Sequence, residues 1–316
     1  VFFGLFSSLF LIKNKYDLIF VFAHSPITVG IPAIFIKKIK KIPLSIWVLD
    51  LWPESITAAG NLKTEIIPKM LLPIVKFIYN NSDLIMVSSR GFKSSIKEKG
   101  ISESKIKYFP QWAENIFESR ALASTHYAHL IPDGFVVMFA GNIGEAQDFN
   151  SVIEAARELK KHENIHWVIL GKGRRELWLK ENIKKFGLEK NFHLLGQFPI
   201  DSIPEFYSYA DALLITLKKE YIFSLTVPAK LQTYLASGKP ILTMLDGQAS
   251  TIVNEAKAGL TSNSGEAKSL AKNILNMSKM KKSKLKNLGE NGFRYFEKNF
   301  KSSVLLNDLE KTFKQL

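Results

Sequence analysis

Short runs of consecutive apolar residues recur along the chain, and each is followed by a stretch with helical periodicity. Near-continuous apolar runs of this length are typical of strands in a parallel sheet that is covered on both faces. The predicted strands are 18–23, 44–49, 84–87, 135–140, 166–170, 192–195, 212–216 and 240–245. Because these strands alternate with helices, the pattern predicts an α/β fold with right-handed crossovers.

The segments between the strands place their apolar residues on one helical face. Residues 150–161 show this best, because the apolar positions recur at intervals of three or four. The apolar positions there are Val152, Ile153, Ala156 and Leu159. Further helices are predicted at 32–41, 175–186, 203–210 and 229–237.

The alternation of strands and helices is interrupted once, between Trp112 and Pro132, and the interruption ends in a Pro-Asp-Gly turn. We therefore expect two Rossmann-like, doubly wound domains that face each other across a cleft. Ligands of such domains bind at the carboxyl ends of the strands. The expected domains are 1–125 and 133–295, followed by a C-terminal helix, 296–316, that crosses back to the first domain.

Composition and net charge limit the kinds of site and partner that the chain can have. The 316 residues include no cysteine, which excludes disulfides, cysteine-ligated zinc and a cysteine nucleophile. The formal net charge is +14, which favours a polyanionic partner: nucleic acid, an anionic membrane surface or a phosphorylated ligand. No nucleic-acid-binding module is recognisable, so nucleic acid is not expected. The apolar residues 1–12 are too few to span a bilayer and are predicted to form a buried amphipathic helix.

Basic residues are concentrated at 37–41 and 278–301. In the first cluster lysines lie beside Phe35 and Ile39, a pattern that suits a helix lying on anionic lipid head groups. A solvated helix end is the alternative interpretation. The expected location is cytoplasmic or peripheral to a membrane.

Two glycine turns follow predicted strands in the second half of the chain. Gly141 and Gly144 stand between a strand and a helix in FAGNIGEAQDF, where glycine lets the backbone approach a phosphate closely. Gly171 and Gly173 occupy the same place in LGKGRREL, where Arg174 is a basic residue suited to a diphosphate. Such turns also form simply to pack a strand on a helix, and that interpretation stays open.

The order of several longer strings carries a resemblance to a known family. GNIG, GKG, LLGQFP, YADALLIT and VPAKLQTYLASGKPIL resemble the donor-binding domain of family 4 (group 1) retaining glycosyltransferases, which have the GT-B fold. DLIFVFAHSP, WVLDLWPES and NSDLIMVSSRGF resemble the first domain of that family. The strings WVLDLWPES and TVPAKLQTYLASGKPIL look most like bacterial N-acetyl-L-fucosamine transferases of O-antigen or capsule assembly.

This resemblance implies a reaction. A sugar, with N-acetyl-L-fucosamine as the candidate, would move from a UDP-sugar to a polyprenyl-diphosphate-linked saccharide with retained configuration, without metal or other cofactor. The expected place is the inner face of the bacterial plasma membrane, with anionic lipid as a partner. The departing diphosphate gains negative charge, so the site must supply cations and amide dipoles. The alternatives are a degenerate or truncated GT-B protein that binds nucleotide or scaffolds an assembly complex and, in last place, a GT-B epimerase.

The resemblance also implies the donor-binding residues. Lys230 in the P-A-K string is the basic residue best placed to reach the diphosphate, and the backbone around Thr226 is suited to cradle phosphate. The backbone after LLGQFP would contact the nucleobase. The full set is Gly141, Asn142, Gly144, Gly171, Gly173, Arg174, Gly196, Gln197, Phe198, Thr226, Lys230 and Thr233.

The sequence departs from the family at four of its usual charged positions. Asn142 and Gln147 stand where relatives have an arginine and a lysine. Leu225 and Thr233 stand where relatives have two glutamates, the second of which binds the donor ribose. A threonine can still hydrogen-bond a hydroxyl, but without charge assistance. These departures motivate the degenerate alternative.

The expected catalytic residues are Asp50, His24 and Lys230. Asp50 begins DLWPES, close to where relatives place a histidine that contacts the transferred sugar, and would orient a hydroxyl or act as a base. The structural alternatives are an Asp that caps a turn and a His that only hydrogen-bonds. Because the family opens with a strand and a glycine-rich turn ahead of the helix at Val1, the first domain is expected to lack its first one or two β-α units.

Overall fold

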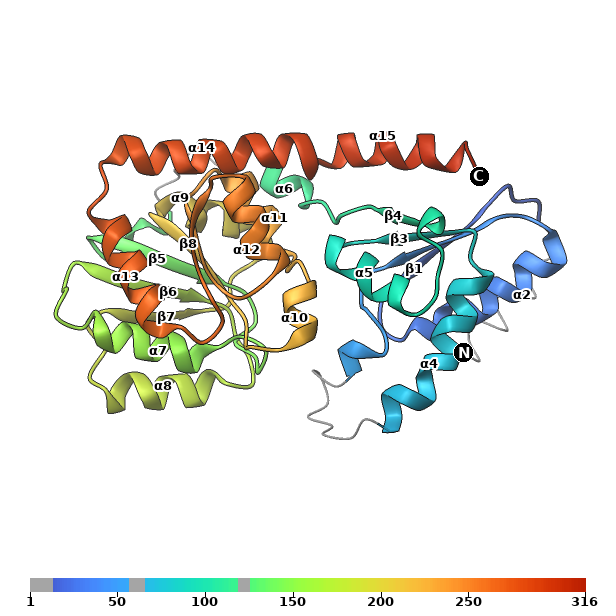
Figure 1. Ribbon diagram of the computed structural model, residues 1–316. Coiled ribbons are helices and arrows are strands. Elements are labelled where there is room, and N and C mark those ends of the chain that lie inside the picture. The colour runs from blue at the N-terminus through green and yellow to red at the C-terminus, as the bar shows by residue number, and fades with distance from the viewer. Residues whose placement is uncertain (1–13, 57–65, 119–125) are drawn as a thin grey trace. The chain divides into compact units, whose positions relative to one another are not determined.

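The computed structural model describes residues 14–56, 66–118 and 126–316 (Figure 1). Contacts divide the chain into two compact units: the described residues up to Gln111 together with Leu305–Leu316, and Trp112–Val304. The helix predicted at 1–12 lies outside the described residues.

The first unit is built on a parallel sheet with the strand order β1-β2-β3-β4. Its elements are β1 (Ile19–Ala23), α2 (Gly30–Lys40), β2 (Leu44–Val48), α4 (Ile66–Asn81), β3 (Leu84–Val87), α5 (Arg90–Glu98) and β4 (Ile106–Tyr108). The main part of α15 (Ser302–Phe313) belongs to this unit by its contacts, and Lys107 Nζ there lies 2.9 Å from a carboxylate oxygen of Asp308. Of the expected C-terminal segment 296–316, residues 305–316 fall in this unit by their contacts.

The second unit carries a parallel sheet with the strand order β10-β9-β8-β5-β6-β7 (Figure 1). Its strands are β5 (Phe135–Ala140), β6 (Ile165–Leu170), β7 (Phe192–Gly196), β8 (Ala212–Thr216), β9 (Ile241–Met244) and β10 (Gly259–Ser262). Its helices are α6 (Asn115–Glu118), α7 (Phe149–Glu158), α8 (Glu176–Lys185), α9 (Ile203–Tyr209), α10 (Tyr221–Leu225), α11 (Lys230–Ser237), α12 (Gln248–Glu255), α13 (Ala267–Ser278) and α14 (Lys282–Asn299). The reversal of strand order beside β5 is the doubly wound arrangement.

Two hydrophobic layers hold this sheet. Alternate residues of β5 point to opposite faces, because successive side chains of a strand do so. Met138 packs in the layer with α9, α11 and α12, whereas Val137 packs in the layer with α7, α8 and α13 (Figure 1). Both residues are fully buried. The sheet is therefore covered on both faces, as its near-continuous apolar strands predict.

The predicted alternation of strands and helices is confirmed, and all eight predicted strands form within two residues of their predicted bounds. The apolar pattern did not predict β4 and β10, which are short strands at sheet edges. An edge strand is buried less completely and so needs no long apolar run. In the part of the chain that the structure describes, no helix is both long enough and apolar enough to cross a membrane.

Candidate functional site

A cavity of about 420 Å³ lies at the carboxyl ends of β5, β6 and β7 in the second unit. This is the end of a doubly wound sheet at which ligands bind. Five of the predicted donor-binding residues line it: Gly141, Asn142, Gly171, Gln197 and Phe198. The sequence therefore located this cavity through turns that lie far apart along the chain.

The wall of the cavity is made of backbone at the glycine turns. The Gly141 N–H donates to the Leu170 carbonyl at 2.9 Å, and the Gly171 N–H donates to the Gly196 carbonyl at 2.6 Å. All three glycines have positive φ, of +146°, +129° and +81° for Gly141, Gly171 and Gly196. A Cβ on Gly171 would lie 1.9 Å from the Gly141 carbonyl oxygen. Glycine is thus required where the first two turns touch, since any side chain would collide with backbone.

The first turn is closed by its own polar side chains. The Gly144 N–H donates to Gln147 Oε1 at 3.2 Å, and a Cβ on Gly173 would lie 2.6 Å from Asn142 Oδ1. Asp148 caps α7 by accepting from the Ser151 N–H at 3.3 Å. Gln147, which stands where the resemblance implies a cation, therefore accepts a hydrogen bond within the turn, and Asn142 lies beside Gly173.

A cation joins this turn to the next one. Arg175 lies 3.3 Å from the Glu145 carboxylate, donates to Asn150 at 2.8 Å and stacks over the Trp178 ring at 3.9 Å. Lys218 also pairs with Glu145, at 3.0 Å. The cations of Lys218 and Arg175 hold the pKa of Glu145 below its usual range. The ion pairs of Arg175 and Lys218 with Glu145 therefore hold the two glycine turns together.

Lys230 begins α11, and its ammonium group is enclosed behind the first glycine turn. Nζ lies 3.7 Å from the centroid of the Phe139 ring, and a Cβ on Gly141 would lie 2.9 Å from Nζ. Desolvation lowers the pKa of Lys230 to about 7. The amine lies beside Gly141, which lines the cavity.

The remaining predicted donor residues do not line the cavity. Thr226 donates to the Ile222 carbonyl at 2.8 Å, and Thr233 donates to the Lys230 carbonyl at 3.0 Å, so both hydroxyl protons are used locally. Arg174 is exposed, whereas the preceding basic residue, Lys172, lines the cavity.

The predicted acceptor-side residues belong to the first unit. His24 directly follows β1 and is exposed, with its ring centroid 4.8 Å from that of Phe22. Asp50 follows β2 by two residues and is half-buried. The two loops are joined, because Trp52 Nε1 donates to Ser25 Oγ at 2.8 Å. His24 and Asp50 thus stand at the carboxyl ends of neighbouring parallel strands.

Several lining residues lay outside the sequence prediction. They are Phe117, Lys172, Ile200, Ile203 and Tyr207, together with the strand ends Ala140 and Leu170. The rings of Phe117 and Tyr207 are stacked with centroids 5.8 Å apart. The signal for Lys172 was present in the basic GKGRR turn, whereas the aromatic residues reach the cavity only through packing on the sheet. Among the described residues, no three His, Asp or Glu side chains are grouped to hold a metal ion.

The family model described as "Glycosyl transferases group 1" matches residues 126–295. WbjE of Pseudomonas aeruginosa, which is named as a glycosyltransferase, is 28% identical over 227 residues, or 67% of this chain and 55% of WbjE. WcaI of Escherichia coli K12, whose name places it in colanic acid biosynthesis, is 27% identical over 164 residues, or 50% of this chain and 40% of WcaI. The matched residues thus span about half of these curated relatives.

Solved structures show the same fold. The crystal structure of Anabaena Alr3699/HepE in complex with UDP and glucose aligns with a TM-score of 0.77 at 17% identity, over 98% of this chain and 81% of that chain. The predicted two-domain GT-B fold with parallel sheets is therefore confirmed.

Proposed function

The chain belongs to the group 1 glycosyl transferases, and on that premise we propose that its second unit binds a UDP-sugar. The proposed reaction moves the sugar, with retained configuration, to a polyprenyl-diphosphate-linked saccharide. The name of WcaI, which refers to colanic acid biosynthesis, supports a place in polysaccharide biosynthesis. N-acetyl-L-fucosamine is the proposed sugar, from the resemblance of the WVLDLWPES and TVPAKLQTYLASGKPIL strings.

The cavity at the carboxyl ends of β5, β6 and β7 is the observation that carries this proposal. Its wall is backbone at Gly141 and Gly171, which gives a diphosphate close access to the main chain. Phe198 and Gln197 line the same cavity beside β7, where a nucleobase would be accommodated. The HepE structures in complex with UDP and glucose and with UDP-glucose are consistent with such a donor.

The proposed chemistry uses the charge on Lys230. When the bond between the anomeric carbon and the diphosphate oxygen breaks, the electron pair stays on the diphosphate. A protonated Lys230 beside Gly141 would stabilise that charge, and a dry environment strengthens the attraction. As the acceptor oxygen forms the new glycosidic bond, Asp50 or His24 would act as the base that takes its hydroxyl proton.

The direct test offers the protein a panel of UDP-sugars, UDP-N-acetyl-L-fucosamine included, and measures binding by native mass spectrometry. We expect one UDP-sugar to bind and its sugar to appear on a polyprenyl-diphosphate-linked acceptor by mass spectrometry of the lipid. UDP alone should compete. If no nucleotide sugar binds, the proposal is wrong.

A second candidate function rests on the replaced charges. Gln147 accepts a hydrogen bond within the first turn, and Thr233 donates to a backbone carbonyl, so a protein that binds nucleotide without catalysis is the alternative. Binding of a UDP-sugar without transfer to any lipid-linked acceptor would favour this second function.

We also propose a peripheral position on an anionic membrane. Large apolar side chains are exposed on α2 and α4, two helices that contact each other in the first unit. On α4 they recur every three or four residues and so share one face: Ile67, Met70, Ile74 and Phe77. On α2, the exposed Phe35 and Ile39 flank the exposed Lys38. Apolar residues beside lysines fit lipid chains and anionic head groups.

We expect Met70→Glu to weaken binding to vesicles containing phosphatidylglycerol by about tenfold, because a charge would enter the apolar layer. Leu177→Glu is the matched control, since the exposed fractions of Met70 and Leu177 are 71% and 69% and Leu177 lies on α8 of the other unit. Co-sedimentation with vesicles measures the effect. Equal loss in both variants, or no binding of the native chain, would contradict the membrane proposal.

A further inference from the structure

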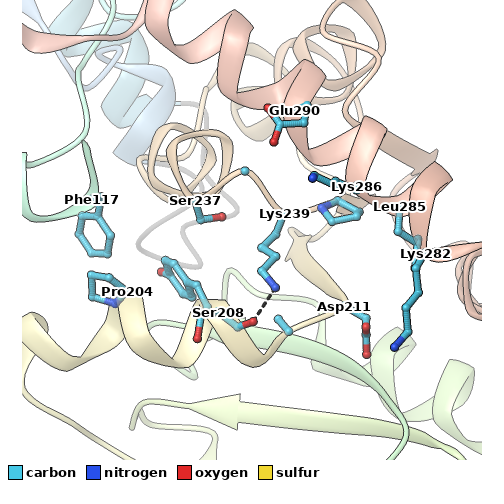
Figure 2. A pocket seen from close by; sticks show the side chains of 14 residues that line it. Phe117, Pro204, Ser208, Asp211, Ser237, Lys239, Lys282, Leu285, Lys286 and Glu290 are labelled. Carbon is cyan, nitrogen blue, oxygen red and sulfur yellow. Dashed lines mark hydrogen bonds between the residues drawn. The ribbon is translucent and has the colours of Figure 1, made fainter. Parts of the chain in front are cut away.

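A second cavity, of about 500 Å³, opens at the other end of the six-stranded sheet (Figure 2). Asp211 and Pro240, which line it, immediately precede β8 and β9. The amino ends of these strands thus face this cavity, whereas the proposed donor cavity lies at the carboxyl ends of the sheet. Its volume lies within the range of small-molecule sites, about 300–1,000 Å³.

Three lysines line this second cavity from separate places in the sequence. Lys239 follows α11, whereas Lys282 and Lys286 lie one turn apart on α14. Figure 2 shows Lys239 and Lys282 extending toward the level of Asp211. Within the described residues, none of the three ammonium groups is within 4.0 Å of a carboxylate oxygen.

Two acidic residues line the cavity against three lysines. Asp211 accepts from the Val136 N–H at 2.8 Å, and burial raises its pKa, while the charges of Lys239 and Lys282 act in the opposite direction. Glu290 is the other acidic lining residue, and it has an interaction of its own. Lys239 donates to the Ser208 carbonyl, and its burial lowers its pKa (Figure 2). A partly buried lysine of this kind gains from an added anion.

Apolar side chains make up part of the remaining wall, and two of them also line the first cavity. Pro204 and Leu285 line the second cavity alone, whereas Phe117 and Tyr207 line both. The stacked rings of Phe117 and Tyr207 therefore stand between the two sites. An apolar wall beside three cations suits a ligand with a ring and a charged group. A phosphate ester brings up to two negative charges, more than one carboxylate offers.

We propose that this second cavity, lined by Lys239, Lys282 and Lys286, binds a small phosphorylated molecule of sugar-phosphate size. The site is separate from the donor cavity and does not depend on the proposed transferase reaction.

The test is a calorimetric titration with ribose 5-phosphate, with ribose as the neutral comparison. We expect the native chain to bind ribose 5-phosphate and not ribose. The double variant Lys282→Gln with Lys286→Gln should bind it at least about tenfold more weakly. Both lysines are exposed, so the fold should persist, and circular dichroism checks this.

The matched control is Lys281→Gln with Lys284→Gln, two exposed lysines of the same region that do not line the cavity. It removes the same net charge and should leave the affinity within about twofold. An equal loss in both double variants would mean general charge attraction and overturn the proposal. So would an absence of binding to the native chain up to about 10 mM ribose 5-phosphate.

Discussion

Lys230→Met is expected to reduce sugar transfer by about 100- to 1000-fold, because it removes the cation proposed to meet the departing diphosphate. The same substitution should stabilise the folded chain. The Lys230 ammonium is enclosed against Phe139, and its lowered pKa means that the charged form is costly in the fold. Methionine keeps the length of the side chain and packs well against an aromatic ring.

The size of the stabilisation follows from the pKa. A fall from 10.5 to about 7 corresponds to roughly 5 kcal/mol at 1.36 kcal/mol per pKa unit. We expect Lys230→Met to raise the free energy of unfolding by about 2 kcal/mol near pH 7. This is less than the full value, because the native chain can relax to hydrate the ammonium. Urea unfolding at several pH values measures it.

The direction in which stability changes with pH depends on whether the folded or the unfolded chain holds the Lys230 proton. Between pH 7 and about 10.5 the unfolded chain holds the Lys230 proton and the folded chain does not, so the stability of the native chain should rise with pH. Below pH 7 both states are protonated and this contribution is constant. Lys230→Met should lack the rise.

Whereas the stability of the native chain should rise with pH above about 7, its affinity for UDP should fall. The diphosphate favours the protonated amine, so binding should weaken as pH rises above 7 in the native chain and much less in Lys230→Met. Lys184→Met, an exposed lysine on α8, is the control and should change neither stability nor transfer. A Lys230→Met variant with native turnover would remove Lys230 from the proposed mechanism.

The sequence predicted the core of the fold because central parallel strands must be apolar on both faces. Residues 84–87, 135–140 and 212–216 form strands with the predicted bounds. The three-residue strand β4 carries Lys107, which is paired with Asp308, and no apolar run announces such an edge strand. The pattern of apolar residues predicts strands that are buried, and the strands at sheet edges are only partly buried.

The candidate site was predictable where backbone geometry demands glycine. Gly141 and Gly171 stand at the ends of predicted strands, and their spacing from the strands located the cavity. Phe117 and Tyr207 were not predictable, because their place depends on how α6 and α9 pack on the sheet. The enclosure of Lys230 against Phe139 depends likewise on the approach of α11 to β5.

Gly171→Ala is expected to destabilise the second unit by about 4 kcal/mol or more and to abolish UDP binding. Its added Cβ would lie 1.9 Å from the Gly141 carbonyl oxygen, and neither strand end can retreat without breaking its hydrogen bonds. The φ of +129° adds strain for any residue with a side chain.

Gly196→Ala is the matched control, because it separates strain from collision. Gly196 ends the neighbouring strand β7 and also has a positive φ, of +81°, but nothing lies within 4 Å of its Cβ position. Gly196→Ala should lower the free energy of unfolding by about 1–2 kcal/mol, which is the strain of a left-handed backbone conformation without a collision. Urea unfolding followed by tryptophan fluorescence, with UDP titration in parallel, compares the two. If both variants lost the same stability, the contact between the Gly141 and Gly171 turns would not control the shape of the donor cavity.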